Sequence, residues 1–302
     1  MMNTATSTLD HVVVNAMFET DAAASCFEAL GFALTPRGYH SLGSVNHLMM
    51  FDGHYLELVG LPPGATTLRR EILESRLGID GLVFKTDDAQ ETYARLIDAG
   101  VRASEPQSFT RPVDIEGVEQ IARFRTTRLA AEELSAGRVY FCEHLTPEWV
   151  FRAEWTKHPN GAQRLKECVI VSDDPQLEAR RYALIAGESV LTSPSFHHSR
   201  IALRDFHLDF IDGAAYRTRY GDLVCHAAGR DSYFGAIVVE VSDLAAMRAR
   251  LDALTSHVDE SVLRLMAPVH AQSGSGASSV VVLLGELNTV IEFIGAVEHA
   301  HA

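Results

Sequence analysis

The sequence predicts an α+β fold built from four βαβββ modules that pair into two tandem domains. The first observation is one order of elements, a strand, an acidic helix start, a helix and further strands, that occurs four times along the 302 residues. The second is that three late strands each carry an acid between apolar residues, namely Glu57, Asp209 and Glu292. The third is that no glycine-rich turn follows the first strand, which disfavours a nucleotide-binding doubly wound sheet.

The first copy of the pattern is the clearest. A helix over residues 21–30 is expected, with Thr20 or Asp21 as its N-cap and Gly31 at its end. The strands expected around it cover residues 9–14, 46–51 and 54–60.

The second copy is predicted to complete a first domain over residues 8–160. Its helix begins after Asp88 and ends at Gly100, and its strands are expected over residues 78–85, 121–127 and 138–144. The turn formers and prolines of residues 146–161 indicate a linker, with Trp149 and Trp155 packing it against the first domain.

The third and fourth copies form the second predicted domain, residues 161–297. Pro175 near the first helical position and Gly187 after the last one delimit the third helix. Ser242 and Asp243 begin the fourth helix. Strands are expected over residues 165–171, 199–203, 206–211, 234–241, 280–284 and 289–295.

Side-chain alternation gives Glu57 a particular environment. Along residues 55–59, Tyr55, Glu57 and Val59 share one face of the strand, and the two leucines share the other. A helix can cover the leucine face. The Glu57 face must then border solvent, a ligand cavity or a metal, because an unpaired carboxylate inside a core is very costly.

Composition bounds the classes of function. Hydrophobic residues make up 47% and charged residues 22%, as in a globular protein with a sizeable core. The net charge of −14 argues against nucleic acid and anionic membrane surfaces as partners. We expect neither a secretory signal nor a membrane span, because the first residues lack a basic and an apolar region and no apolar run is long enough to cross a bilayer. The four scattered cysteines indicate reduced thiols in a cytoplasmic protein.

The residues 9–14, 46–48 and 55–58 resemble the vicinal oxygen chelate superfamily, and more narrowly its glyoxalase-like branch. The resemblance implies open barrels of the glyoxalase, bleomycin-resistance and extradiol dioxygenase kind. It also implies a divalent metal, Fe, Mn, Zn or Ni, with His11 and Glu57 as the ligands of the first module.

The second module offers an incomplete ligand set. Gly81 stands where the resemblance leads us to expect a first-strand histidine. On the last strand we favour His144 as the third metal ligand, with Glu143 as the second choice, because adjacent residues face opposite ways. Glu57, Glu143 and His47 are the candidate catalytic bases for proton transfer beside the metal.

Four residues are candidates for substrate binding: Asn46, His47, Arg37 and Arg123. His47 shares a strand face with Met49, which is one way to line a cavity. Three of the four have a plain alternative. Asn46 also suits a backbone hydrogen bond, Arg37 suits a solvated loop, and Arg123 with Arg125 suits an exposed sheet face.

Two functions remain open. The first is a metal-dependent lyase, isomerase or dioxygenase acting on a small oxygen-rich substrate. The second is a non-catalytic protein that sequesters a small molecule without metal, which the loss of a ligand at Gly81 favours. The second domain, with Cys168 near the position of His11, is expected to be structural or a partner surface, and a homodimer formed through the sheets is one option.

Overall fold

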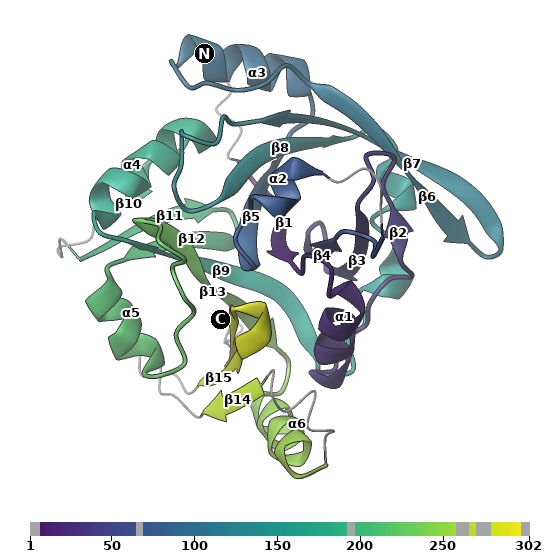
Figure 1. Ribbon diagram of the computed structural model, residues 1–302, viewed down its shortest axis with the longest axis vertical. Coiled ribbons are helices and arrows are strands. Elements are labelled where there is room, and N and C mark those ends of the chain that lie inside the picture. Colours follow the sequence, from purple (N-terminus) through teal and green to yellow (C-terminus); the bar gives the residue numbers. More distant parts are fainter. Residues whose placement is uncertain (1–6, 65–68, 192–196, 258–265, 270–278, 297–302) are drawn as a thin grey trace, which may run out of the picture.

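The computed structural model describes residues 7–64, 69–191, 197–257, 266–269 and 279–296. Two eight-stranded sheets have the same strand order, β2-β3-β4-β1-β5-β8-β7-β6 and β10-β11-β12-β9-β13-β16-β15-β14 (Figure 1). The predicted α+β class is confirmed, and the count of four copies stays a prediction. No helix in the described ranges is long and apolar enough to cross a bilayer.

The first sheet lies within the first half of the chain. Its central strand β1 pairs in parallel with β4 and antiparallel with β5. The two edge strands of the sheet lie close together. The N–H of Ser41, after β2, donates to the carbonyl of Thr110 on β6 at 2.9 Å. The sheet therefore curls into a nearly closed barrel. Its strands are β1 (Leu9–Asn15), β2 (Gly38–Tyr39), β3 (Val45–Met50), β4 (Tyr55–Gly60), β5 (Gly78–Lys85), β6 (Gln107–Ile115), β7 (Val118–Arg128) and β8 (Arg138–His144).

The second sheet repeats this pairing. Strand β9 pairs in parallel with β12 and antiparallel with β13. Strands β5 and β13 contact each other where the two sheets meet (Figure 1). The strands are β9 (Ala162–Ser172), β10 (Val190–Leu191), β11 (His198–Leu203), β12 (Phe206–Ile211), β13 (Ser232–Val241), β14 (Met266–Val269), β15 (Ser279–Leu284) and β16 (Thr289–Gly295).

The helix starts follow local sequence with one exception. Asp88 and Asp174 accept hydrogen bonds from backbone N–H groups of the first turn, as predicted. The N-cap expected at Thr20 or Asp21 is wrong: the N-cap is Glu19, without a side-chain bond, and Thr20 packs instead against Gly60, where a Cβ would leave it no room. The helices are α1 (Thr20–Ala29), α2 (Arg70–Leu73), α3 (Ala89–Asp98), α4 (Pro175–Ala186), α5 (Gly213–Tyr220) and α6 (Leu244–His257), with short 3₁₀ turns η1 (Pro147–Trp149), η2 (Ala153–Trp155) and η3 (Gly285–Leu287).

The two faces of each sheet border different cores. Leu56 and Leu58 belong to a large hydrophobic cluster that includes residues of both sheets and of the helices, whereas Tyr55 and Val59 belong to a separate cluster inside the first sheet. The face assignment predicted for residues 55–59 is therefore confirmed. Because the large cluster is continuous, with the rings of Phe32 and Phe293 6.0 Å apart, the two halves share one core.

The expected linker is fastened to the first half of the chain. The side chain of Asn160 donates to the carbonyl of Leu30 at 3.1 Å, and the ring of His158 contacts the carbonyl of Met50 at 2.8 Å. Trp149 and Trp155 pack on the cluster inside the first sheet, as predicted. This segment lies between the last strand of the first sheet and the first strand of the second.

Arg76 joins the two halves through backbone contacts. Its buried guanidinium donates to the carbonyls of Ile79 at 2.7 Å, Phe234 at 2.6 Å and His226 at 2.9 Å.

Replacing Arg76 with Met is expected to lower the free energy of unfolding by about 3 kcal/mol or more, because each buried carbonyl left unpaired costs about 1–3 kcal/mol. Urea unfolding measures the change. Arg70→Met, at an exposed position, is the control, and an equal small effect of both variants contradicts the prediction.

Candidate metal centre and cavity of the first sheet

The pairing of β1 with β4 brings His11 and Glu57 together. The parallel register sets His11 opposite Tyr55 and Val13 opposite Glu57, so both side chains face the inside of the curled sheet. The Nε2 atom of His11 lies 3.5 Å from Oε2 of Glu57, and both residues are buried. The ring of His11 stacks on Tyr55 with centroids 4.4 Å apart, which holds the plane of the imidazole.

Asp10 fixes the orientation of two histidines. Its carboxylate is fully buried and contacts Nδ1 of His11 at 2.5 Å and Nε2 of His144 at 2.8 Å. Burial opposes ionisation, but His144 and His11 hold the pKa of Asp10 well below its usual range. Because Asp10 takes Nδ1 of His11, the Nε2 atom of that ring is directed toward Glu57.

Glu57 is held as a carboxylate by its neighbours. The amide of Asn46 donates to Oε1 of Glu57 at 2.7 Å. Although burial opposes ionisation, His11 and this amide are among the groups that keep the pKa of Glu57 below its usual value. His40 lies 3.9 Å from the same oxygen, and burial lowers the pKa of His40 to about 4, so its imidazole is neutral near pH 7.

The side chains enclose a small cavity of about 40 Å³. A larger cavity of about 300 Å³ adjoins it, and Arg69, Arg128, Arg138 and Tyr140 line both. The small cavity has room for an ion or a water molecule, and the larger one has room for an organic molecule. The other residues around the small cavity are His11, Val13, His40, Asn46, Leu48, Tyr55, Glu57, Val59, Phe109, Arg111, Phe124 and Cys142.

Two sets of donor atoms lie near this cavity. His11 and Glu57 form a pair, with the hydroxyl of Tyr140 3.2 Å from Nε2 of His11. Of the residues that the structure describes, Asp10, Cys142 and His144 form a group whose ligand atoms lie within 4.8 Å of one another. Burial and the nearby Asp10 raise the pKa of the Cys142 thiol well above its usual value.

A comparison with protein families identifies the family of this chain. The model of the glyoxalase-like domain matches residues 9–185, which is more than half of the chain. The chain belongs to the glyoxalase-like domain family. This confirms the resemblance seen in the strands that carry His11 and Glu57. A search of curated protein sequences finds no significant match.

Three solved structures share the fold of this chain. A hypothetical protein from Staphylococcus aureus has a TM-score of 0.66 at 11% identity, covering 96% of this chain and 100% of its own. A mutant 4-hydroxymandelate synthase from Streptomyces coelicolor has a TM-score of 0.55 at 15% identity, covering 96% and 92%. A xylose isomerase-like TIM barrel/4-hydroxyphenylpyruvate dioxygenase fusion protein has a TM-score of 0.55 at 13% identity, covering 99% of this chain and 50% of its own. At these identities the likeness concerns the fold.

Two candidate bases face away from the cavity. The carboxylate of Glu143 accepts the N–H of Ala89 at 3.0 Å, so it anchors the start of α3 on the opposite face of β8. His47 contacts the carbonyl of Thr35 at 2.9 Å and shares its strand face with Met49, which belongs to the core shared by both halves. The expectation that His47 lines the cavity is wrong, because the helix-covered face of β3 is the one that carries His47.

The two arginines chosen from the sequence also lie elsewhere. Arg37 pairs with Asp21 on α1, and Arg123 is exposed on the outer face of β7. The substrate-binding roles proposed for them therefore have no support in their positions. The structure instead places Arg111 in the cavity that His11 and Glu57 line. Arg111 lies on β6, a strand that the sequence analysis did not anticipate.

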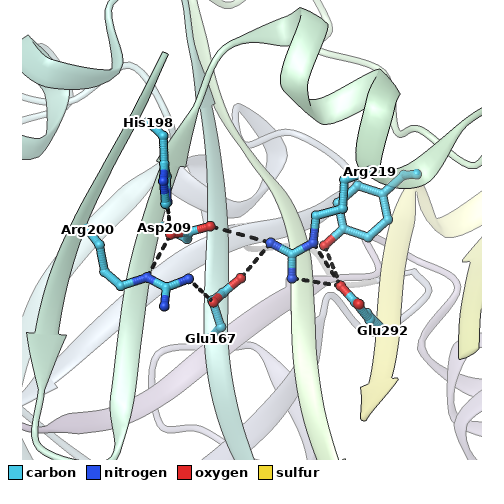
Figure 2. A network of polar contacts seen from close by, with 7 residues as sticks. Glu167, His198, Arg200, Asp209, Arg219 and Glu292 are labelled. Atoms are coloured by element: carbon cyan, nitrogen blue, oxygen red, sulfur yellow. Dashed lines mark hydrogen bonds and ion pairs between the residues drawn. The ribbon is translucent and has the colours of Figure 1, made fainter. Parts of the chain in front are cut away.

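The second sheet places three carboxylates where the first sheet places His11, Glu57 and Tyr140. Strand register equates Glu167 with His11 and Asp209 with Glu57, so Cys168, expected near the position of His11, faces the shared core instead. Figure 2 shows Arg219 of α5 between these carboxylates. Its guanidinium lies 2.7 Å from Glu167, 3.4 Å from Asp209 and 2.8 Å from Glu292.

This cluster is a closed ion-pair network. His198 and Arg200 contact Asp209 at 2.6 and 2.9 Å, and the hydroxyl of Tyr220 donates to Glu292 at 2.9 Å. Burial and the neighbouring Asp209 raise the pKa of Glu167. Arg219 therefore supplies the positive charge that the buried carboxylates need. The structural or partner-surface role expected for this half of the chain stays a prediction.

Replacing Arg219 with Met is expected to lower the free energy of unfolding by about 3–5 kcal/mol at pH 7, because buried carboxylates lose their counter-charge. Those carboxylates then have folded-state pKa values above their unfolded ones. The folded variant consequently takes up more protons than the unfolded chain as pH falls, so its deficit against wild type becomes smaller between pH 7 and pH 5.

Urea unfolding at both pH values measures this. Arg217→Met, which removes an exposed arginine from the same helix, is the control and is expected to change stability little. A deficit for Arg219→Met that is no larger than the control, or one that grows toward pH 5, contradicts the assignment.

Proposed function

We propose that this protein is a divalent-metal-dependent enzyme that acts on a small oxygen-rich molecule inside the first sheet. The observation that carries the proposal is the directed pair of His11 and Glu57. Asp10 occupies Nδ1 of the imidazole, which leaves Nε2 facing a carboxylate at 3.5 Å in a buried cavity. A carboxylate behind a ligating histidine is the usual support for such a ligand.

The donors present fit a divalent ion. Bonds from a metal to imidazole nitrogen and carboxylate oxygen are about 2.0–2.2 Å long. Nε2 of His11 and Oε2 of Glu57 are 3.5 Å apart, so both atoms can bind the same ion. One nitrogen and one oxygen donor suit Fe, Mn, Zn or Ni. A metal held there would supply Lewis acidity toward substrate oxygens. The proposed third ligand, His144, contacts Asp10, and its role stays a prediction.

The surrounding side chains would position the substrate and move protons. Asn46 holds one oxygen of Glu57 and thereby aims the other at His11. Burial raises the pKa of Tyr140 above its usual value, so its hydroxyl stays protonated and can donate to a substrate oxygen. Neutral His40, beside Glu57, is placed to accept a proton. We assign lyase, isomerase or dioxygenase chemistry to the protein, with Glu57 as a metal ligand and the candidate catalytic base.

The second candidate function is a non-catalytic small-molecule binder. Gly81 favours it, because β5 contributes no ligand: a Cβ at this position would lie 2.8 Å from Cβ of Val13. Such a protein would use the same cavity without metal. We place either protein in the cytoplasm, since all four cysteines are buried and unpaired.

Metal analysis of protein purified without chelator tests the proposal. Wild type is expected to retain about one divalent ion per chain, and His11→Ala and Glu57→Gln are expected to lose it, because each removes one of two directed donors. The measurement is elemental analysis after reconstitution with Fe, Mn, Zn or Ni. Circular dichroism checks that the variants fold.

His144→Ala separates the two donor sets. Loss of metal in this variant with retention in His11→Ala would place the ion on Asp10, Cys142 and His144 and would contradict our assignment. Folded wild type that holds no metal after reconstitution would favour the binder.

A further inference from the structure

The wall between the two cavities of the first sheet carries excess positive charge. Arg69, Arg128 and Arg138 line both cavities, and Arg230 lines the larger one. The acids of the larger cavity are already engaged. Glu71 contacts Arg69 at 2.8 Å and Arg128 at 3.2 Å, Glu74 contacts Arg70 at 3.0 Å, and Asp80 pairs with Arg230.

Arg138 has no acidic partner among the described residues. Among the described residues it donates no hydrogen bond and forms no ion pair, and its Nε and one terminal nitrogen are buried without a partner. A buried guanidinium with unused donors costs free energy that a bound anion would offset. This is the opposite of the second sheet, where Arg219 meets three carboxylates.

Arg111 repeats the pattern in the small cavity. Arg111 lies on β6 and is only 3% exposed, and its side chain forms no hydrogen bond or ion pair within the part of the chain that is described. Burial lowers the pKa of Arg111, although Tyr55 and Glu57 oppose that effect. Each cavity thus contains an arginine side chain that forms no ion pair with a described residue, although the charge of Glu57 acts on Arg111.

Much of the remaining wall of the larger cavity is apolar. Leu129, Leu134 and Val139 form part of its wall, together with the small side chains of Ala130 and Ala131. An inorganic ion gains little from such a wall, whereas an organic body gains by burial. The planar fork of an arginine matches the two oxygens of a carboxylate.

We propose that the ligand of the first sheet is an organic carboxylate with a short apolar body. The carboxylate binds Arg138, the body occupies the larger cavity, and an oxygen at the other end reaches toward Arg111 and the His11–Glu57 pair. The assignment of that last oxygen as the reacting group depends on the proposed function, whereas the binding of the carboxylate by Arg138 does not.

Isothermal titration of metal-free wild type with hexanoate, hexanamide and inorganic phosphate tests this. Hexanoate is expected to bind at least about tenfold more tightly than hexanamide, which has the same shape without the charge, because a charge-assisted hydrogen bond is worth about 1.5–3 kcal/mol. Phosphate is expected to bind more weakly than hexanoate. Equal binding of hexanoate and hexanamide, or tighter binding of phosphate, overturns the proposal.

Two substitutions locate the anion. Arg138→Met and Arg138→Gln are expected to reduce hexanoate affinity to the level of hexanamide, and Arg123→Met, on the exposed outer face, is expected to leave it unchanged. Thermal unfolding confirms that each variant folds. Unchanged hexanoate affinity in both folded Arg138 variants overturns the assignment.

His11→Ala separates this proposal from the metal centre. Preferential hexanoate binding that persists in His11→Ala supports the carboxylate site even if wild type holds no metal. Metal retention by wild type without any preference for hexanoate overturns the carboxylate site and leaves the metal centre standing.

Discussion

The centre of the first sheet depends on one buried carboxylate shared by two histidines. Asp10 contacts His11 on one side and His144 on the other, and the contact to His144 has the length of a charge-assisted hydrogen bond. Because the carboxylate is completely buried, these contacts are what keep it ionised. They also set which ring nitrogen of His11 meets Glu57, and so the orientation of the proposed metal pair follows from them.

The two sheets show two physical answers to the same constraint. Equivalent strands of both carry acids on the concave face, and a buried acid must be paired. In the second sheet, Arg219 from α5 enters between Glu167, Asp209 and Glu292 and completes the network (Figure 2). In the first sheet, imidazole and amide groups surround Glu57, and space remains beside it. The first sheet therefore keeps a cavity where the second has a closed network.

The arginines of the first sheet extend this contrast. Arg111 and Arg138 come from β6 and β8 and line the cavities, and neither side chain forms an ion pair among the described residues. A protein interior rarely leaves such groups without partners. Arg138 lines both the space next to His11 and Glu57 and the larger, mostly apolar space. This combination of shape and charge is the reason that we propose an organic anion as the ligand.

Much of this architecture follows from the sequence alone. Acidic residues at Asp88 and Asp174 begin helices because their side chains satisfy free N–H groups within a few residues, and alternation along residues 55–59 separates Glu57 from its leucines. Local chemistry and strand period are sufficient for these. Tertiary structure alone decided which face of β3 is covered, and this left His47 half-buried on the covered face. It also decided that Glu143 anchors the start of α3. It also decided that Asp10 faces two histidines, because the irregular pairing of β1 with β5 near Leu9 and His11 interrupts the strict alternation of side chains. Strand β6, which the sequence analysis did not predict, carries Arg111 into the cavity. Contacts between residues far apart in the chain depend on how a sheet curls and closes, and no local pattern encodes that curvature.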